Sequence, residues 1–375
     1  MVKKILAVII VLGIVLAASP LYIKRGLYRN FANITDYQFF DNAIVKKGKP
    51  EAWLISSNYN KEAIPQTYLD TLEKDKSVAY LVIQNDSILY EKYWRGYSDS
   101  SLSGSFSMAK SVTSLLIGIA ISEGKIKSVD DRISDYIPEF KHTGTDSIRI
   151  RDILTMSGGF KWTESYLNIF GKTSDIYYGD NVRKVVGNLK AAYAPGKLFY
   201  YSSAETQILG WILANVYGKK VPELLSEKIW SKIGAEHDAL WSLDKAGGAP
   251  KVFCCLNSNA RDFARLGKLV LQQGRWDSAQ VVPANYIQEA TTPASYLKDK
   301  EDGSTVDFYG FQFWIMHYKG LTIPYFRGVL GQFIYLIPEK NAVVVRLGEK
   351  VSKDQIRHHK VDSYMHIDAA LKILK

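Results

Sequence analysis

Ser107 and Lys110 stand three residues apart at the point where an apolar stretch begins. Apolar residues recur at helical spacing over 108–121, and Gly124 follows as a stop signal, so the pattern predicts a helix that starts beside Ser107. Positions i and i+3 share one face of a helix, which brings the lysine amine within reach of the serine hydroxyl.

A serine hydroxyl is a weak nucleophile at neutral pH unless a neighbouring base activates it. Lysine can be that base only where burial or another cation lowers its pKa, and a helix N-terminus offers backbone N–H groups to a developing oxyanion. Ser107 and Lys110 therefore predict nucleophilic catalysis. The alternative is a chance match, in which Ser107 caps a solvated helix.

Tyr201 lies in the segment 195–203, directly before a second apolar stretch at helical spacing that ends at Gly218. A phenol beside a lysine ammonium can be stabilised as phenolate and can carry a proton between nucleophile and leaving group. The segment thus predicts a proton shuttle, with an aromatic loop anchor as the alternative.

A third segment, 327–332, contains Gly328 and Gly331 and precedes two strand-like runs at 333–337 and 342–347. The pattern predicts a hairpin with glycines just ahead of its first strand. Glycine lets the backbone approach a ligand closely, so an N–H group here is a candidate second oxyanion donor. A β-bulge is the alternative.

In order and spacing, these three segments resemble the serine β-lactamase and penicillin-binding-protein-like hydrolases, specifically the class C related branch, from about Val78 to about Gly348. Stretches without catalytic residues match as well, at 148–159, 259–267, 274–276, 281–283 and 309–314. The resemblance implies an α+β fold in which an antiparallel sheet is flanked by helices and carries an inserted all-helical lobe.

The resemblance also assigns roles residue by residue. It makes Ser107 the acyl-accepting nucleophile, Lys110 its base partner and Tyr201 the proton shuttle. Ser203 takes the third place of the family's Tyr-x-Asn element, where asparagine orients a substrate amide, and it offers a single hydroxyl instead. The backbone N–H groups of Ser107 and Gln332 are the implied oxyanion donors, with Gly331 beside the substrate.

The third element departs from the β-lactamases. They carry Lys or His, then Thr or Ser, then Gly, whereas this chain has Val329, Leu330 and Gly331. Arg327 shares the strand face of Val329 but lies about 6.6 Å away along the strand. An apolar residue followed by Gly-Gln more closely resembles the esterase and 6-aminohexanoate-dimer hydrolase branch.

This resemblance implies a serine hydrolase that cleaves a linear amide or ester through an acyl-enzyme. A D-Ala-D-Ala peptidase or β-lactamase is one alternative, and a catalytically silent, membrane-anchored wall-binding protein is another. Aromatic residues fall where the branch has a loop overhanging the cleft, and they could wall an acyl pocket: Trp162, Tyr166, Phe170, Tyr177 and Tyr178. Among them Tyr166 is expected to contact the substrate.

The N-terminus has Lys3 and Lys4, an uncharged stretch over 5–23, and then Lys24 and Arg25. Such a stretch nearly spans a bilayer, so residues 1–25 are predicted to be a membrane anchor, with a cleavable signal as the alternative. Residues 26–74 are predicted to be a linker and lead-in, and 75–375 the hydrolase domain. The resemblance implies an extracytoplasmic catalytic domain, at the periplasmic side or the cell surface, or secreted if the segment is cleaved.

The formal charge of +10 includes five basic residues of the N-terminal region, and nothing in the chain resembles a nucleic-acid module. The histidines lack metal-ligand spacing, so no metal is expected. The serine hydrolase that the resemblance implies needs no organic cofactor. Cys254 and Cys255 are adjacent, a spacing that rarely allows an unstrained disulfide. The predicted partners are a small amide or ester and, through the N-terminal segment, a membrane.

Three further elements complete the prediction. Strand-like runs at 78–83 and 88–94 predict a hairpin, a short helix is expected after Pro65, and a closing helix is expected over 354–374. The first hairpin and the C-terminal hairpin should share one sheet, with the nucleophile between this sheet and the helical lobe.

Overall fold

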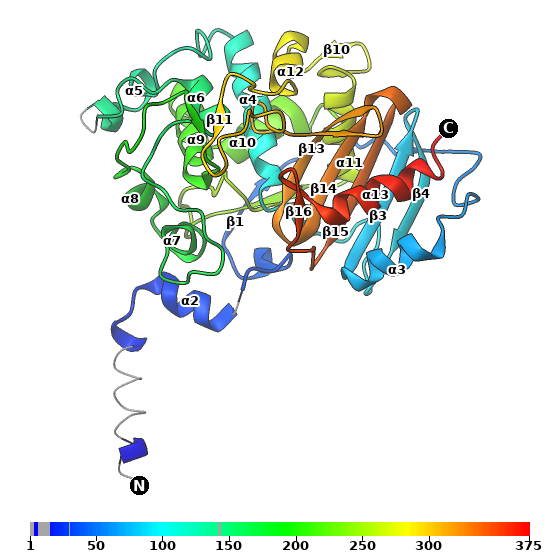
Figure 1. The fold of residues 1–375 in the computed structure, drawn as a ribbon, viewed down its shortest axis with the longest axis horizontal. Coiled ribbons are helices and arrows are strands. Elements are labelled where there is room, and N and C mark those ends of the chain that lie inside the picture. The colour runs from blue at the N-terminus through cyan, green and yellow to red at the C-terminus, as the bar shows by residue number, and fades with distance from the viewer. Residues whose placement is uncertain (1–3, 7–15, 30, 142–143) are drawn as a thin grey trace.

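A computed structural model describes residues 4–6, 16–29, 31–141 and 144–375. Its largest sheet has seven strands in the order β12-β13-β14-β15-β3-β4-β2, antiparallel except where β2 pairs with β4 (Figure 1). In that order the strands are Trp314–Tyr318, Leu321–Gly328, Gln332–Ile337, Ala342–Gly348, Ser77–Gln84, Ser87–Tyr93 and Leu54–Ile55.

Both predicted hairpins are present and meet in this sheet. β3 pairs with β4, β14 pairs with β15, and β15 pairs with β3 in a register that sets Val344 opposite Val82. The middle strands are buried on both faces, which is why their sequences are continuous apolar runs rather than alternating ones.

Helices cover both faces of the sheet. α11 (Ala260–Leu271) lies against β14 and β15, and a side chain at Gly267 would collide with Val343, so this helix approaches the sheet closely. α3 (Gln66–Lys74), the predicted helix after Pro65, packs beside α13 (Val361–Leu371). The closing helix is shorter than predicted, because β16 (Gln355–Ile356) and β17 (His359–Lys360) form a small hairpin before it.

The helical lobe forms the other half of the molecule (Figure 1). Its central helices are α4 (Met108–Ser122), which is buried on almost every side, and α9 (Ser203–Tyr217). Gly124 and Gly218 adopt the left-handed conformation just after these helices, as predicted stop signals should. The other helices are α5 (Ile133–Tyr136), α6 (Ile150–Leu154), α7 (Lys172–Tyr178), α8 (Val182–Val186), α10 (Val221–Leu225) and α12 (Ala284–Ala290). The predicted α+β architecture with an inserted helical lobe is confirmed.

A second sheet, in the order β1-β7-β8-β5, ties the N-terminal region to the segment before Ser107. Its strands are Asn42–Val45, Ala239–Ser242, Leu256–Ser258 and Ser103–Gly104. The segment expected to be a linker and lead-in, 26–74, thus contributes β1, β2 and α3 to the folded unit. The strands β1 and β2 were not predicted, because they are short and pair with β7 and β4, and no local sequence pattern indicates such pairing.

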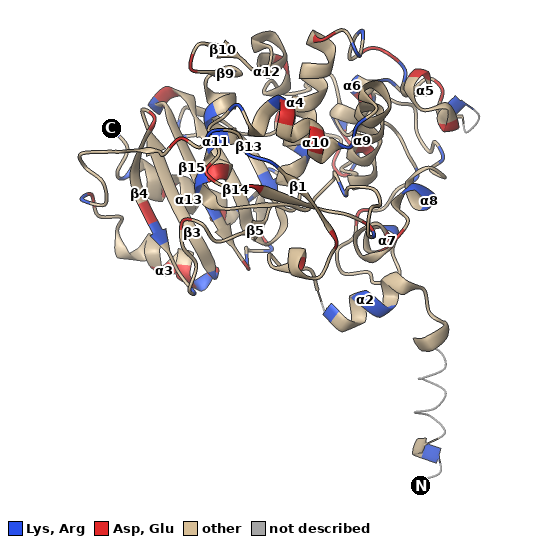
Figure 2. Ribbon diagram, turned by 180° about the vertical axis from the view of Figure 1, so that it is seen from behind, with Lys and Arg blue, Asp and Glu red and all other residues tan. Residues whose placement is uncertain are grey.

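α2 (Leu21–Arg29) lies where the N-terminal segment meets the body of the protein, and it packs against α7 (Figure 1). Within the part of the chain that the structure describes, no helix is both long and apolar enough to cross a bilayer. The middle of the predicted anchor, 7–15, lies outside the described residues. Figure 2 shows basic and acidic residues interspersed over the body of the protein, with basic residues on α2.

Cys254 and Cys255 are joined in a disulfide, contrary to the sequence-based expectation for adjacent cysteines. Because the bond links neighbours in the chain, it closes no long loop and cannot hold distant elements together.

Candidate active site

Ser107 lies at the N-terminal end of α4, in a tight turn beneath the end of β13. Phe106, directly before it, has a φ of +45°, an uncommon value for a residue with a side chain. Gly328 at the end of β13 passes so close that a side chain there would collide with the Ser105 carbonyl oxygen. The turn therefore aims Ser107 into the space between the sheet and the helical lobe.

Lys110 is fully buried one turn further along α4. Its Nζ lies 3.0 Å from Ser107 Oγ, 3.1 Å from Ser203 Oγ and 2.7 Å from the Phe253 carbonyl oxygen. Burial lowers the pKa of Lys110 to about 7, although the Glu164 carboxylate opposes this shift. A large share of Lys110 is therefore neutral near pH 7, as a lysine base requires.

The partners of Lys110 also fix where its lone pair points. The Phe253 carbonyl can only accept hydrogen bonds, and the Ser203 hydroxyl donates its one hydrogen to Glu164 Oε1 at 2.7 Å. Only Ser107 therefore has a hydrogen to give to a neutral Lys110. The arrangement can remove a proton from Ser107 and from no other neighbour.

Tyr201 completes the group around the nucleophile. Its hydroxyl is hydrogen-bonded to Ser107, and its ring centroid lies 5.2 Å from Lys110 Nζ. Burial raises the pKa of Tyr201 well above its usual value, and the bond to Ser107 only partly opposes this. Burial thus favours the neutral phenol of Tyr201 over the phenolate that the neighbouring lysine would favour, and its role as proton shuttle stays a prediction.

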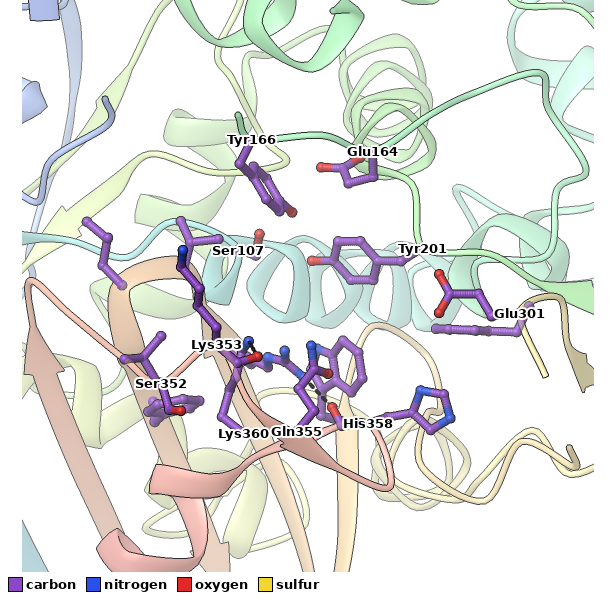
Figure 3. A pocket seen from close by; sticks show the side chains of 18 of the residues that line it. Ser107, Glu164, Tyr166, Tyr201, Glu301, Ser352, Lys353, Gln355, His358 and Lys360 are labelled. Carbon is purple, nitrogen blue, oxygen red and sulfur yellow. Dashed lines mark hydrogen bonds between the residues drawn. The ribbon is translucent and has the colours of Figure 1, made fainter. Parts of the chain in front are cut away.

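Glu164 is a residue of this site that the sequence reasoning missed. Its carboxylate accepts hydrogen bonds from the Ser203 backbone N–H at 2.9 Å and from Trp162 Nε1 at 2.7 Å, besides the Ser203 hydroxyl. Figure 3 shows Glu164, Tyr166 and Tyr201 turned toward Ser107. The only signal in the sequence was an acidic residue inside the aromatic loop.

Two cavities meet at Ser107. The first, of about 480 Å³, is the polar cavity: it is lined by Glu164, Tyr201 and Arg327, among others (Figure 3). The second, of about 380 Å³, is the apolar cavity and extends toward α2 and α7. A bound molecule with its reactive carbonyl at Ser107 would thus have one part in each cavity.

The predicted aromatic wall is formed in part. Tyr166 lines both cavities and is half exposed, while Tyr177 and Tyr178 line the apolar cavity. Trp162 is buried, and its Nε1 donates a hydrogen bond to Glu164. Phe170 is exposed, and neither it nor Trp162 is among the residues that line the two cavities.

In the third segment, residues 327–330 line the polar cavity, and Val329 and Leu330 also line the apolar cavity. Gln332 is buried, and its Nε2 donates to the Gly348 carbonyl at 2.6 Å, while the Gly331 carbonyl accepts from Arg346 at 2.8 Å. Neither Gly331 nor Gln332 is among the residues that line the two cavities; the Gln332 side chain and the Gly331 carbonyl instead hold the hairpin. Their role beside the substrate, through backbone N–H groups, stays a prediction.

Arg327, the cation nearest to Val329 along the chain, lines the polar cavity. It donates to the His358 carbonyl at 2.7 Å and lies 4.3 Å above the Trp314 ring. Near it, Asp299, Asp302 and His358 bring ligand atoms within 4.8 Å of one another, the one such cluster in the described ranges. Asp299 and His358 line the polar cavity together with Ser107.

Comparison with known proteins agrees with this geometry. The sequence profile of the family described as Beta-lactamase matches residues 69–363. The chain is 26% identical over 317 residues to a 6-aminohexanoate-dimer hydrolase of Paenarthrobacter ureafaciens, a match covering 80% of this chain and 79% of that protein.

Two solved structures are similar in fold. A Bacillus anthracis protein provisionally named a 6-aminohexanoate-dimer hydrolase superposes with a TM-score of 0.78 at 24% identity, over 90% of this chain and 92% of the other. A family VIII carboxylesterase superposes with a TM-score of 0.67 at 17% identity, over 86% and 99% of the two chains.

Proposed function

The chain belongs to the beta-lactamase family and is a serine hydrolase, and from this premise we propose that it cleaves a linear amide or ester through an acyl-enzyme on Ser107. One observation carries the proposal. The Ser107 hydroxyl lies between Lys110 Nζ, at 3.0 Å, and the Tyr201 hydroxyl, which is the set of groups that nucleophile activation needs.

In the acylation step, neutral Lys110 takes the proton of Ser107 while Oγ bonds to the substrate carbonyl carbon. The backbone N–H of Ser107, at the positive end of α4, donates to the oxyanion, and the Gln332 N–H is the proposed second donor. The bond to the leaving nitrogen or oxygen then breaks. Tyr201 gives that atom its phenolic proton and regains one from the Lys110 ammonium.

Deacylation follows the same route with water in place of the leaving group. Lys110 takes a proton from water as the water oxygen bonds to the acyl carbon, and the proton returns to Ser107 Oγ as the ester bond breaks. Each group ends in its starting state, and the products are a carboxylic acid and an amine or alcohol.

A linear substrate is favoured over a β-lactam by the third segment. Val329 stands at the place of the family's lysine or histidine, so no cation from that position meets a substrate carboxylate. The relative named as a 6-aminohexanoate-dimer hydrolase supports the same choice. We further propose that residues 1–25 attach the enzyme to a membrane, with the catalytic unit on the extracytoplasmic side.

The test is the pre-steady-state release of p-nitrophenol from p-nitrophenyl butyrate by the full-length protein in a mild detergent. A burst of about one equivalent per chain, followed by turnover, is expected from an acyl-enzyme. Ser107→Ala should lose the burst and keep its circular dichroism spectrum. Equal release by both proteins would refute the proposal.

Two other outcomes identify the alternatives. Stable acylation by benzylpenicillin together with failure on linear esters would indicate a D-Ala-D-Ala peptidase. Absence of turnover on esters, amides and penicillins by the folded protein would indicate a silent binding protein.

A further inference from the structure

The apolar cavity beside Ser107 is lined on one side by a helix that lies outside the segment matched by the family profile. α2 contributes Gly26 and Leu27 to its lining, and Leu167, Val329 and Leu330 line it from other elements. Its volume of about 380 Å³ falls in the range of small-molecule sites, roughly 300–1,000 Å³.

Specific contacts fix α2 in this place. Arg25 donates to the Tyr178 carbonyl at 3.0 Å, and Arg29 Nε donates to Asp36 Oδ1 at 3.1 Å. The Tyr177 hydroxyl donates to the other oxygen of Asp36 at 2.8 Å, so α2, α7 and the segment after α2 share one network.

Gly26 adds a close approach between α2 and Ile169, which lies just before α7. A Cβ at this position would lie 3.2 Å from the Ile169 side chain, which is tighter than ordinary contact. Hydrogen bonds from Arg25 and Arg29 and close packing at Gly26 therefore hold α2 in place as a wall of the cavity.

The chemistry of Ser107 decides which part of a substrate enters which cavity. The leaving group must receive a proton from Tyr201, and Tyr201 lines the polar cavity. The opposite side of the carbonyl, which carries the acyl chain, then faces the apolar cavity, whose lining near the nucleophile is Ser203, Phe253 and Cys254. Among the lining residues, Tyr201 belongs to the polar cavity and Ser203 to the apolar one.

We propose that the apolar cavity between α2 and Ser107 binds the hydrocarbon chain of the acyl group, so that the substrate is an ester or amide of an unbranched aliphatic acid with a polar leaving group. α2 limits the length of the chain through Leu27. This inference rests on the proposed acyl-enzyme, and it adds the substrate class and the element that selects it.

The test is kcat/KM of the full-length protein for p-nitrophenyl esters of straight-chain acids with two, four, six and eight carbons. Burial of the chain predicts a rise of about three- to fourfold per methylene until the cavity is full. Leu27→Trp fills the cavity from the exposed helix, so it should abolish the rise with chain length and lower kcat/KM far more for the octanoate than for the acetate. Leu21→Trp is the matched control, because Leu21 is also exposed on α2 but does not line the cavity, and it should behave as wild type.

Three results would overturn the inference: a profile that is flat with chain length, an equal loss on acetate and octanoate in Leu27→Trp, or a gain that follows the length of the alcohol in alkyl acetates instead. The last result would mean that the two cavities have the opposite roles. Failure of the proposed function is distinguishable from these, because the acetate burst would then persist in Ser107→Ala.

Discussion

Replacing Glu164 with glutamine should move the acidic limb of the pH–rate profile to lower pH. The rate depends on neutral Lys110, so kcat/KM rises with pH through the pKa of that amine, which burial sets at about 7. The Glu164 carboxylate stabilises the ammonium form and so raises this pKa. Removing its charge favours the neutral amine, and the pKa must fall.

The geometry gives the size of the shift. Lys110 Nζ and Glu164 Oε1 are bridged by Ser203 Oγ through bonds of 3.1 and 2.7 Å. Two unit charges about 6 Å apart interact by about 3 kcal/mol at an effective dielectric constant of about 20, which equals about 2 pKa units. Glu164 is partly exposed, so solvent screening reduces this, and a shift of about 1 unit is expected.

The assay is kcat/KM for p-nitrophenyl butyrate from pH 5 to 9 at constant ionic strength. Wild type should show a limb near pH 7, and Glu164→Gln a limb near pH 6. Glu73→Gln, with the same loss of charge at an exposed position of α3, is the control and should leave the limb in place. An unmoved limb, or one at higher pH, in Glu164→Gln would refute the reasoning.

Two further predictions concern the proton shuttle and the core. Tyr201→Phe should lower kcat for an anilide or alkylamide about 10²- to 10⁴-fold but lower it far less for a p-nitrophenyl ester, whose leaving group departs without a proton; equal losses on the two substrates would contradict the shuttle. Ile117→Ala removes a fully buried side chain from α4 and should lower the free energy of unfolding by about 2–5 kcal/mol in urea titrations, whereas Ile44→Ala, at a half-exposed position of β1, should change it by about 0.5 kcal/mol or less. Similar midpoints for these two variants would mean that α4 is not the packed centre of the lobe.

Much of the catalytic centre could be read from the sequence because it depends on local geometry. Ser107 and Lys110 meet because residues three apart on a helix are neighbours, whatever surrounds the helix. The two hairpins and the ends of α4 and α9 follow from strand patterns and from glycines in turns, which are equally local. The order of the three segments then pointed to the family and, through it, to the fold.

Tyr201 marks the limit of this approach. Its position before α9 was predictable, but its protonation state was not, because the pKa depends on how deeply Trp314 and Tyr309 bury the ring. The predicted phenolate followed from Lys110 alone. The burial that overrides it comes from segments more than 100 residues away in the chain.

Glu164, α2 and the pair of cavities belong wholly to the tertiary structure. The Glu164 carboxylate contacts Ser203 across 39 positions of sequence, and Arg25 of α2 contacts Tyr178 of α7 across 153. No periodicity or spacing in the sequence predicts either contact. The sequence by itself determined which groups could do the chemistry, since spacing within one helix or turn is fixed by backbone geometry. Only the packed structure decided the charge of each group and the space open to a substrate, because desolvation and cavity shape arise from residues that folding alone brings together.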